Sequence, residues 1–282
     1  MRAGQRTKTI VWIAAVILLL GAPVQAEPPM QSYTSGFGIV LRTSEGLYQA
    51  LPSLYSRNLA PRPISIEATE APMIQAVATT DEGKTTREVS MSAGLIDLMN
   101  HVAHAKAIDA IQPGFFAAYI GNLSRRGAAA SPPDIVDPRY WTDSIINDQE
   151  SYFNQMAGVL IGIHLSHHYL GHYAKYSDKL VGADGKPRPL NEVITGSEWE
   201  ASVKAGTVNS LDCALATGGA RALFQAIDQM PTRPRWAAYL VPPSADLKEL
   251  IKELDRYEFD FFHGLLKRDK VPEEQMLAKG TK

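Results

Sequence analysis

The sequence predicts an α+β protein, in which a helical body carries one small antiparallel sheet. Long segments place apolar residues at helical spacing, as in 95–111, where Leu95, Leu98 and Met99 begin the pattern. Three short strand-like runs, 64–68, 74–79 and 87–91, follow one another with turn-rich links between them. Strands that are adjacent in sequence and separate from the helices are typical of α+β rather than α/β proteins.

The remaining elements follow from local signals in chain order. Pro61-Arg62-Pro63 ends an opening helix, and Asp81-Glu82-Gly83-Lys84 has the composition of a hairpin connection. Ser197 is expected to cap a helix, with Glu200 at the capping-box position. Segments 127–139 and 231–243 are expected to be loops. Further helices are predicted at 36–58, 148–176, 208–216, 221–227 and 245–266.

The first 26 residues have the pattern of a secretory signal peptide. A basic start precedes the apolar run 10–20, and small residues then allow cleavage after Ala26. The apolar run is too short for a comfortable membrane span, although an uncleaved anchor is the alternative. Residues 27–282 then form a single domain in the periplasm or outside the cell, without stable membrane insertion.

The charge and cysteine content exclude several classes of partner and scaffold. Without the three basic residues of the signal, the chain carries 25 basic and 30 acidic residues, a formal charge of −5. A mildly acidic chain without a basic stripe argues against nucleic acid as a partner. Cys213 is the single cysteine, so an internal disulfide cannot form.

Four of the seven histidines lie in one stretch of nine residues, His164 to His172. On a continuous helix, His168 and His172 are one turn apart on the same face, as in the H-E-x-x-H zinc helix. His164 would lie about 12 Å from His172 along the axis, too far to share its ion. We therefore expect His168 and His172 to be metal ligands, with His164 and His167 packing around them. An incidental polar helix face is the alternative.

A third ligand must come from elsewhere in the chain. Glu198 and Asp212 are the candidates, since an unpaired carboxylate is costly to bury and a metal ion offsets that cost. Glu198 could instead favour a helix N-terminus, and Asp212 could pair with Arg221. Spacing alone does not choose between them.

Three blocks resemble the HtpX-like zinc metallopeptidases, relatives of the CAAX prenyl endopeptidase. Strand-like residues 64–78 and 89–95 are similar to the family's strand pair and following helix. His168-Tyr169-Leu170-Gly171-His172 matches the family's His-Glu-x-Gly-His except at Tyr169. Glu198-Trp199-Glu200-Ala201-Ser202 resembles the family's Glu-x-x-Ala-Asp. The resemblance covers about residues 60–205 and implies a zincin-like (gluzincin) domain. It also implies zinc held by His168, His172 and Glu198, and so favours Glu198 over Asp212, which stays the reserve candidate.

Two departures from the family pattern bear on activity. Tyr169 occupies the position of the glutamate general base, and a phenol with a reference pKa of about 10 is a poor base at neutral pH. Ser202 replaces an aspartate that would support the ligands. We therefore expect little or no ordinary peptidase activity.

Three hypotheses follow. The first is a secreted, metallopeptidase-like protein that keeps zinc or another divalent metal, has lost or altered hydrolysis, and binds polypeptide by strand addition. The second is an active zinc-dependent hydrolase in which Tyr169, His167 or another residue supplies the base. The third is a metal-free helical interaction protein whose histidines pack or sense pH. The sequence leaves the substrate, partner and oligomeric state open.

Overall fold

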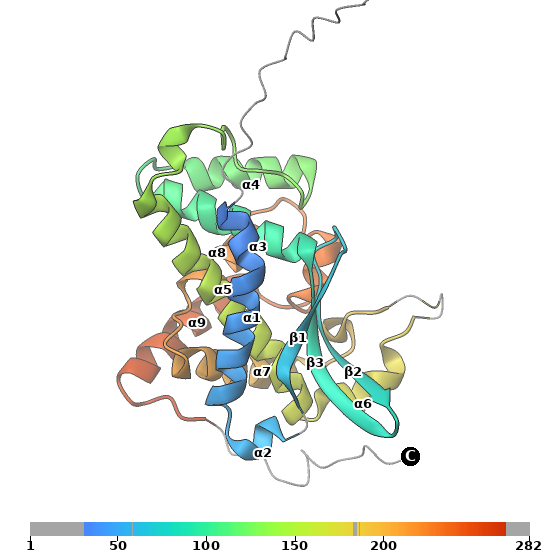
Figure 1. The fold of residues 1–282 in the computed structure, drawn as a ribbon. Coiled ribbons are helices and arrows are strands. Elements are labelled where there is room, and N and C mark those ends of the chain that lie inside the picture. The colour runs from blue at the N-terminus through green and yellow to red at the C-terminus, as the bar shows by residue number, and fades with distance from the viewer. Residues whose placement is uncertain (1–30, 58, 183–184, 186, 269–282) are drawn as a thin grey trace, which may run out of the picture.

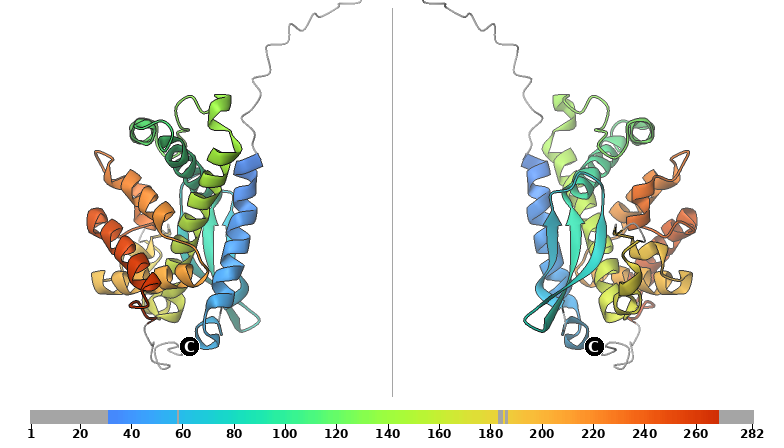
Figure 2. Two further views of the ribbon diagram at one scale, coloured as in Figure 1. Left: turned by 90° about the vertical axis from the view of Figure 1, so that its left-hand side faces the viewer. Right: turned by 90° about the vertical axis from the view of Figure 1, so that its right-hand side faces the viewer.

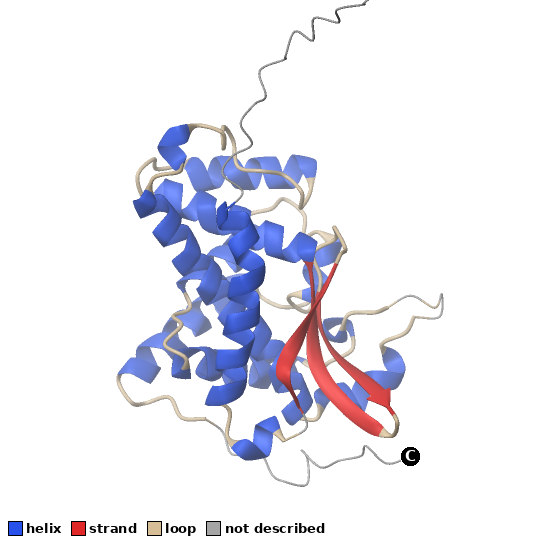
Figure 3. Ribbon diagram, in the orientation of Figure 1, coloured by secondary structure: helices blue, strands red, loops and turns tan. Residues whose placement is uncertain are grey.

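The computed structural model describes residues 31–57, 59–182, 185 and 187–268. The expected signal peptide, residues 1–26, lies outside this part of the chain. The described chain is mostly helical with one three-stranded sheet, which confirms the α+β prediction (Figures 1 and 3). The helices are α1 (Gln31–Ala50), α2 (Ser53–Ser56), α3 (Ala93–Asp109), α4 (Phe115–Arg126), α5 (Asp143–Tyr169), α6 (His172–Tyr176), α7 (Gly196–Asp212), α8 (Gly218–Asp228) and α9 (Leu247–Phe262).

The central element is α5, which contacts α1, α3, α7 and α8 as well as strands β2 and β3. Figure 2 shows α1 on one side of the molecule and α8 and α9 on the other, with α5 between them. Residues 156–165 of α5 are buried on every side. Such a helix has no solvent face, which explains why its apolar residues are nearly continuous.

The sheet is mixed rather than antiparallel, which corrects the sequence prediction. Its strands are β1 (Leu59–Glu67), β2 (Ile74–Asp81) and β3 (Lys84–Ser92), in the order β1-β3-β2. β2 and β3 form the expected antiparallel hairpin, but β1 pairs with β3 in parallel. β2 is therefore an edge strand, and β1 is covered by α1.

The link between β1 and β2 explains the parallel pairing. It passes over the point where β3 enters α3, and the amide of Gly94 donates to Thr69 O at 2.9 Å. A Cβ on Gly94 would lie 1.9 Å from Glu70 O, so only glycine allows this crossing. This contact between the backbones at Glu70 and Gly94 cannot be inferred from the hydrophobic periodicity of β1 or β3.

Several predicted boundaries also change. Ser197 does not cap α7; Thr195 does, and α7 continues through the predicted break to Asp212. The helix α4 was not predicted at all, and it begins after Gly114, whose φ is 92°. Pro61 and Pro63 lie inside edge strand β1 and not before it, at an irregularity between Leu59 and Ile64.

Candidate functional site at the end of α5

The histidines are positioned by an unusually close crossing of α5 and α7. A Cβ on Gly162 would lie 2.5 Å from Gly206 O, and a Cβ on Gly206 would lie 2.2 Å from Ile163 N. One turn further along α5, the hydroxyl of Ser166 donates to Ser202 O at 3.3 Å. The two backbones therefore touch, and the residues after Ser166 meet the first turns of α7.

The spacing of small residues in the sequence is a signal for this crossing. Small residues recur every four positions on both helices, at Gly158, Gly162 and Ser166 on α5 and at Ser202, Gly206 and Ser210 on α7. Such spacing places them on one stripe of each helix and allows close approach. It could have predicted that His167 and Ser202 are neighbours.

The predicted helix 148–176 is wrong at both ends, and its C-terminal end changes the site. α5 begins at Asp143 and ends at Tyr169, and α6 begins separately at His172. Between them Gly171 has φ 79°, the left-handed conformation with which glycine commonly ends a helix. His168 and His172 therefore do not share a helix face, and the geometry of a zinc helix is not formed.

The chain reversal at Gly171 brings His172 beside His167 instead. Their Nδ1 atoms are 3.3 Å apart, and each lies 3.0 Å from the hydroxyl oxygen of Ser202. That hydroxyl also donates to Glu198 O at 3.0 Å. His164 packs against His167, with ring centroids 5.4 Å apart. His167, expected only to support the ligands, is thus the centre of the cluster.

His168 points to the sheet, away from this cluster. Its Nε2 lies 2.8 Å from Glu88 O of β3, so the ring donates its N–H to that carbonyl. Its ring centroid is 5.1 Å from that of Tyr173 on α6. Nδ1 is buried without a hydrogen-bond partner among the described residues. The imidazole therefore acts as a link between α5 and β3.

All four imidazoles are held in the neutral form. Burial lowers the pKa of His164 to about 3 and those of His168 and His172 to about 4. Burial, with the neighbouring rings of His164 and His172, lowers the pKa of His167 well below its ordinary value. A charged imidazole would lose its hydration here without gaining a nearby anion of sufficient strength.

The carboxylate of Glu198, at the start of α7, is hydrogen-bonded to three neighbouring residues. Its carboxylate accepts from Lys175 Nζ at 2.6 Å, from Tyr176 at 2.8 Å and from the amide and hydroxyl of Thr195. Burial alone would raise the pKa of Glu198, but these donors lower it to about 2. The capping box therefore joins Thr195 to Glu198 rather than Ser197 to Glu200, because α7 starts two residues earlier than predicted.

Asp212, the reserve ligand, lies at the other end of α7. It forms an ion pair with Arg268 and not with Arg221, which pairs with Asp255 instead. Ser202, which contacts the histidines, is ten residues before Asp212 on α7, so about 15 Å of helix separates Asp212 from them.

Tyr169 faces away from the histidine cluster and packs against α2. Its ring stacks on Tyr55 with centroids 4.9 Å apart and planes 7° apart. The hydroxyl is buried without a hydrogen-bond partner among the described residues. Burial raises the pKa of this phenol above its ordinary value. In this position it cannot take a proton from a water near His168 or His172.

The predicted ligand set does not fit one ion as these residues are placed. His168 is bonded to the sheet, His172 to Ser202, and Glu198 to Lys175 and Tyr176. Within the described part of the chain, no group of three or more His, Cys, Asp or Glu side chains is arranged to hold a metal ion. Zinc binding by these three residues stays a prediction and would require each of them to give up its present partner.

A second feature beside the cluster is the outer edge of β2. The amide of Ala78 donates to the hydroxyl of Tyr173 at 3.2 Å. Ala78 therefore directs its backbone groups away from β3, and alternation along an antiparallel strand directs those of Ala76 and Thr80 the same way. In the described residues no strand pairs with this edge.

Comparisons with protein-family models, with curated proteins and with solved structures give no match for this chain. Among the helices that the structure describes, each is too short or too polar to cross a membrane. The chemistry of the site itself is therefore the basis for a functional proposal.

Proposed function

We propose that the protein binds an extended polypeptide along the outer edge of β2 and does not hydrolyse it. The observation that carries the proposal is the outward amide of Ala78, which bonds to a side-chain hydroxyl rather than to another strand. Unpaired strand edges are templates for an added strand, whose backbone supplies the missing hydrogen bonds. Figure 3 shows β2 on the outer side of the sheet. The signal-like N-terminal sequence makes the periplasm part of the same proposal.

The chemistry at the end of α5 supports binding without hydrolysis. A metallopeptidase needs a bound metal and a base that faces the metal-bound water. Here Tyr169 stacks on Tyr55 away from the histidines, and His168 already donates to Glu88 O. The histidines then have a structural role, since the cluster of His167 and His172 joins α5, α6 and α7, and His168 joins α5 to β3.

A pair of tyrosines on α6 provides the test. Tyr173→Phe removes the hydroxyl that competes for the Ala78 amide, whereas Tyr176→Phe removes a hydroxyl that bonds to Glu198 and Lys175 and not to β2. We expect Tyr173→Phe to tighten binding of a neutral heptapeptide of alternating threonine and valine by about 2–10-fold, the value of one net hydrogen bond. Tyr176→Phe should leave the affinity unchanged. Isothermal titration calorimetry measures both.

Amide hydrogen exchange locates the peptide. Adding it should slow exchange at Ala78 and Thr80 at the accessible end of β2, while Val77 and Thr79, which already face β3, change little. Equal protection at both sets, or none, would rule out strand addition. Mass spectrometry should find the peptide intact after incubation with and without zinc. Cleavage that is lost in His168→Ala would instead establish the active-hydrolase alternative.

A further inference from the structure

Arg87, on β3, is a charged residue without a carboxylate partner beside the open edge of the sheet. Its side chain is half-buried. In the part of the chain that the structure describes, its guanidinium forms no ion pair and no side-chain hydrogen bond. A guanidinium matches a carboxylate with two parallel hydrogen bonds, a geometry that a point charge does not offer. Arg87 can therefore meet a carboxylate that a partner supplies.

The register of the sheet places Arg87 beside Ala78, the residue whose amide points outward. The two residues are directly paired across β3 and β2. Directly paired residues of an antiparallel sheet project from the same face, and they lie closest where the backbone groups point away from the partner strand, as at Ala78. Because the side chain of Ala78 is a single methyl group, it adds little bulk between the guanidinium and the edge.

The face of the sheet from which Arg87 projects is the one that α5 approaches. Burial is the main cause of the low pKa of His168 on α5, and the charge of Arg87 lowers it further, which indicates that the two side chains are near each other. The closest acids on the hairpin, Asp81 and Glu88, alternate onto the opposite face. The hairpin itself therefore leaves this guanidinium without a counter-charge.

We propose that the segment bound along β2 carries a glutamate opposite Ala78 and that Arg87 recognises it. This inference rests on the strand addition proposed above and names the chemistry of the added strand. An added strand lies about 5 Å from β2 and about 10 Å from β3, a gap that an arginine and a glutamate side chain span together over the methyl group of Ala78. The shorter aspartate spans it less well, and a lysine meets a like charge. Arg87 thus selects acidic over neutral or basic partner sequences.

Calorimetry with four related heptapeptides tests this recognition. The central residue of the alternating threonine and valine peptide is replaced by glutamate, glutamine, aspartate or lysine. The glutamate peptide should bind about 3–10-fold more tightly than the glutamine peptide, which keeps the length without the charge. The aspartate peptide should lie between these two, and the lysine peptide should bind most weakly. Hydrogen exchange should show protection of the Ala78 amide by the glutamate peptide.

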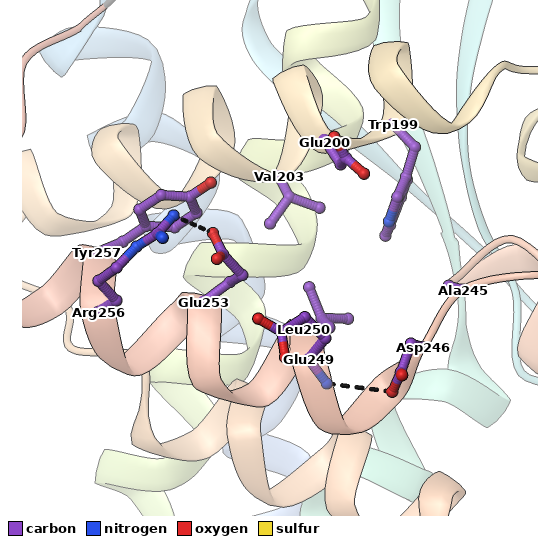
Figure 4. A pocket seen from close by; sticks show the side chains of 10 residues that line it. All are labelled: Trp199, Glu200, Val203, Ala245, Asp246, Glu249, Leu250, Glu253, Arg256 and Tyr257. Carbon is purple, nitrogen blue, oxygen red and sulfur yellow. Dashed lines mark hydrogen bonds and ion pairs between the residues drawn. The ribbon is translucent and has the colours of Figure 1, made fainter.

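Two arginine variants make the result specific. Arg87→Gln should bring the affinities of the glutamate and glutamine peptides within about 1.5-fold of each other, because the charge that distinguishes them is gone. Arg256→Gln is the matched control, since it removes the same charge on α9. There Arg256 lines a cavity of about 460 Å³ between α7 and α9 and is already paired with Glu253 (Figure 4). This variant should keep the preference for glutamate. Thermal unfolding of each variant verifies that it is folded.

The possible outcomes separate this inference from the strand addition on which it rests. Equal binding of the glutamate and glutamine peptides to the unmodified protein overturns the role of Arg87, while protection at Ala78 still supports strand addition. A preference that survives in folded Arg87→Gln, or that is lost in Arg256→Gln, also overturns it and assigns the charge recognition to another site. If none of the peptides binds, strand addition itself fails and this inference fails with it.

Discussion

Tyr169 packs as a core aromatic residue at the end of α5. Its ring lies flat on Tyr55, and its hydroxyl is buried without a partner among the described residues. An unsatisfied buried hydroxyl loses its hydration and gains nothing in return. The position that a peptidase would use for its base is therefore occupied by a side chain whose contribution here is apolar packing.

Substitutions at Tyr169 should show this role directly. Tyr169→Phe keeps the stacked ring and should raise the free energy of unfolding by up to about 1 kcal/mol. Tyr169→Glu, which restores the peptidase pattern, should lower it by about 3 kcal/mol or more, because it buries a carboxylate. Urea unfolding measures both. Tyr176→Phe, which loses a bond to Glu198, should destabilise the protein. A peptidase activity gained by Tyr169→Glu would contradict this interpretation.

At the scale of elements, the crossing of α5 and α7 controls the site. Because Gly162 and Gly206 lack side chains, the backbones approach until Ser202 reaches His167 and His172. The left-handed turn at Gly171 then returns His172 towards α7. Three glycines thus decide which histidines are neighbours.

Two glycines of α7 allow a matched test of that crossing. An added Cβ at Gly206 would lie 2.2 Å from Ile163 N, whereas one at Gly196 meets nothing within 4 Å. Gly206→Ala should lower the free energy of unfolding by about 3 kcal/mol, because the helices must separate. Gly196→Ala should be neutral or slightly stabilising. Similar effects of the two substitutions in urea unfolding would show that the close crossing is not needed.

At the scale of the whole molecule, buried histidines couple stability to pH. Burial lowers the pKa of six of the seven histidines: His101 and His104 in α3, and the four near the end of α5, His164, His167, His168 and His172. The unfolded chain binds their protons below a pH of about 6.5, whereas burial in the folded chain lowers the pKa of His101, His168 and His172 to about 4. In this window the unfolded state holds more protons, so stability falls as the pH falls.

Thermal unfolding between pH 7.5 and pH 4 checks this. We expect a stability plateau above about pH 6.5 and a progressive loss towards pH 4, of at least about 1 kcal/mol for each fully buried histidine. A melting temperature that is constant from pH 7 to pH 5 would contradict the assignment of neutral, buried imidazoles.

Much of the fold follows from local sequence, but the site does not. The stripe of apolar residues in α5, the hairpin at Glu82-Gly83 and the cavity-facing helix α9 are all encoded within a few turns of chain. The predicted end of α5 lies seven residues beyond Tyr169, and the predicted cap of α7 lies two residues beyond Thr195. In both cases a competing local signal led to the wrong boundary. The four-residue spacing of histidines continues past Gly171, and Ser197 is also a residue type that commonly caps helices.

The sequence by itself determined the class of the fold, the order of most elements and the unusual gathering of histidines near one helix end. Only the tertiary structure decided that His172 meets His167, that His168 joins the sheet and that Tyr169 turns towards α2. The physical reason is the range of the interactions. Periodicity and capping act within one or two turns, whereas the contacts of these side chains depend on two backbone crossings, at Gly94 and at Gly162 with Gly206, between segments far apart in the chain.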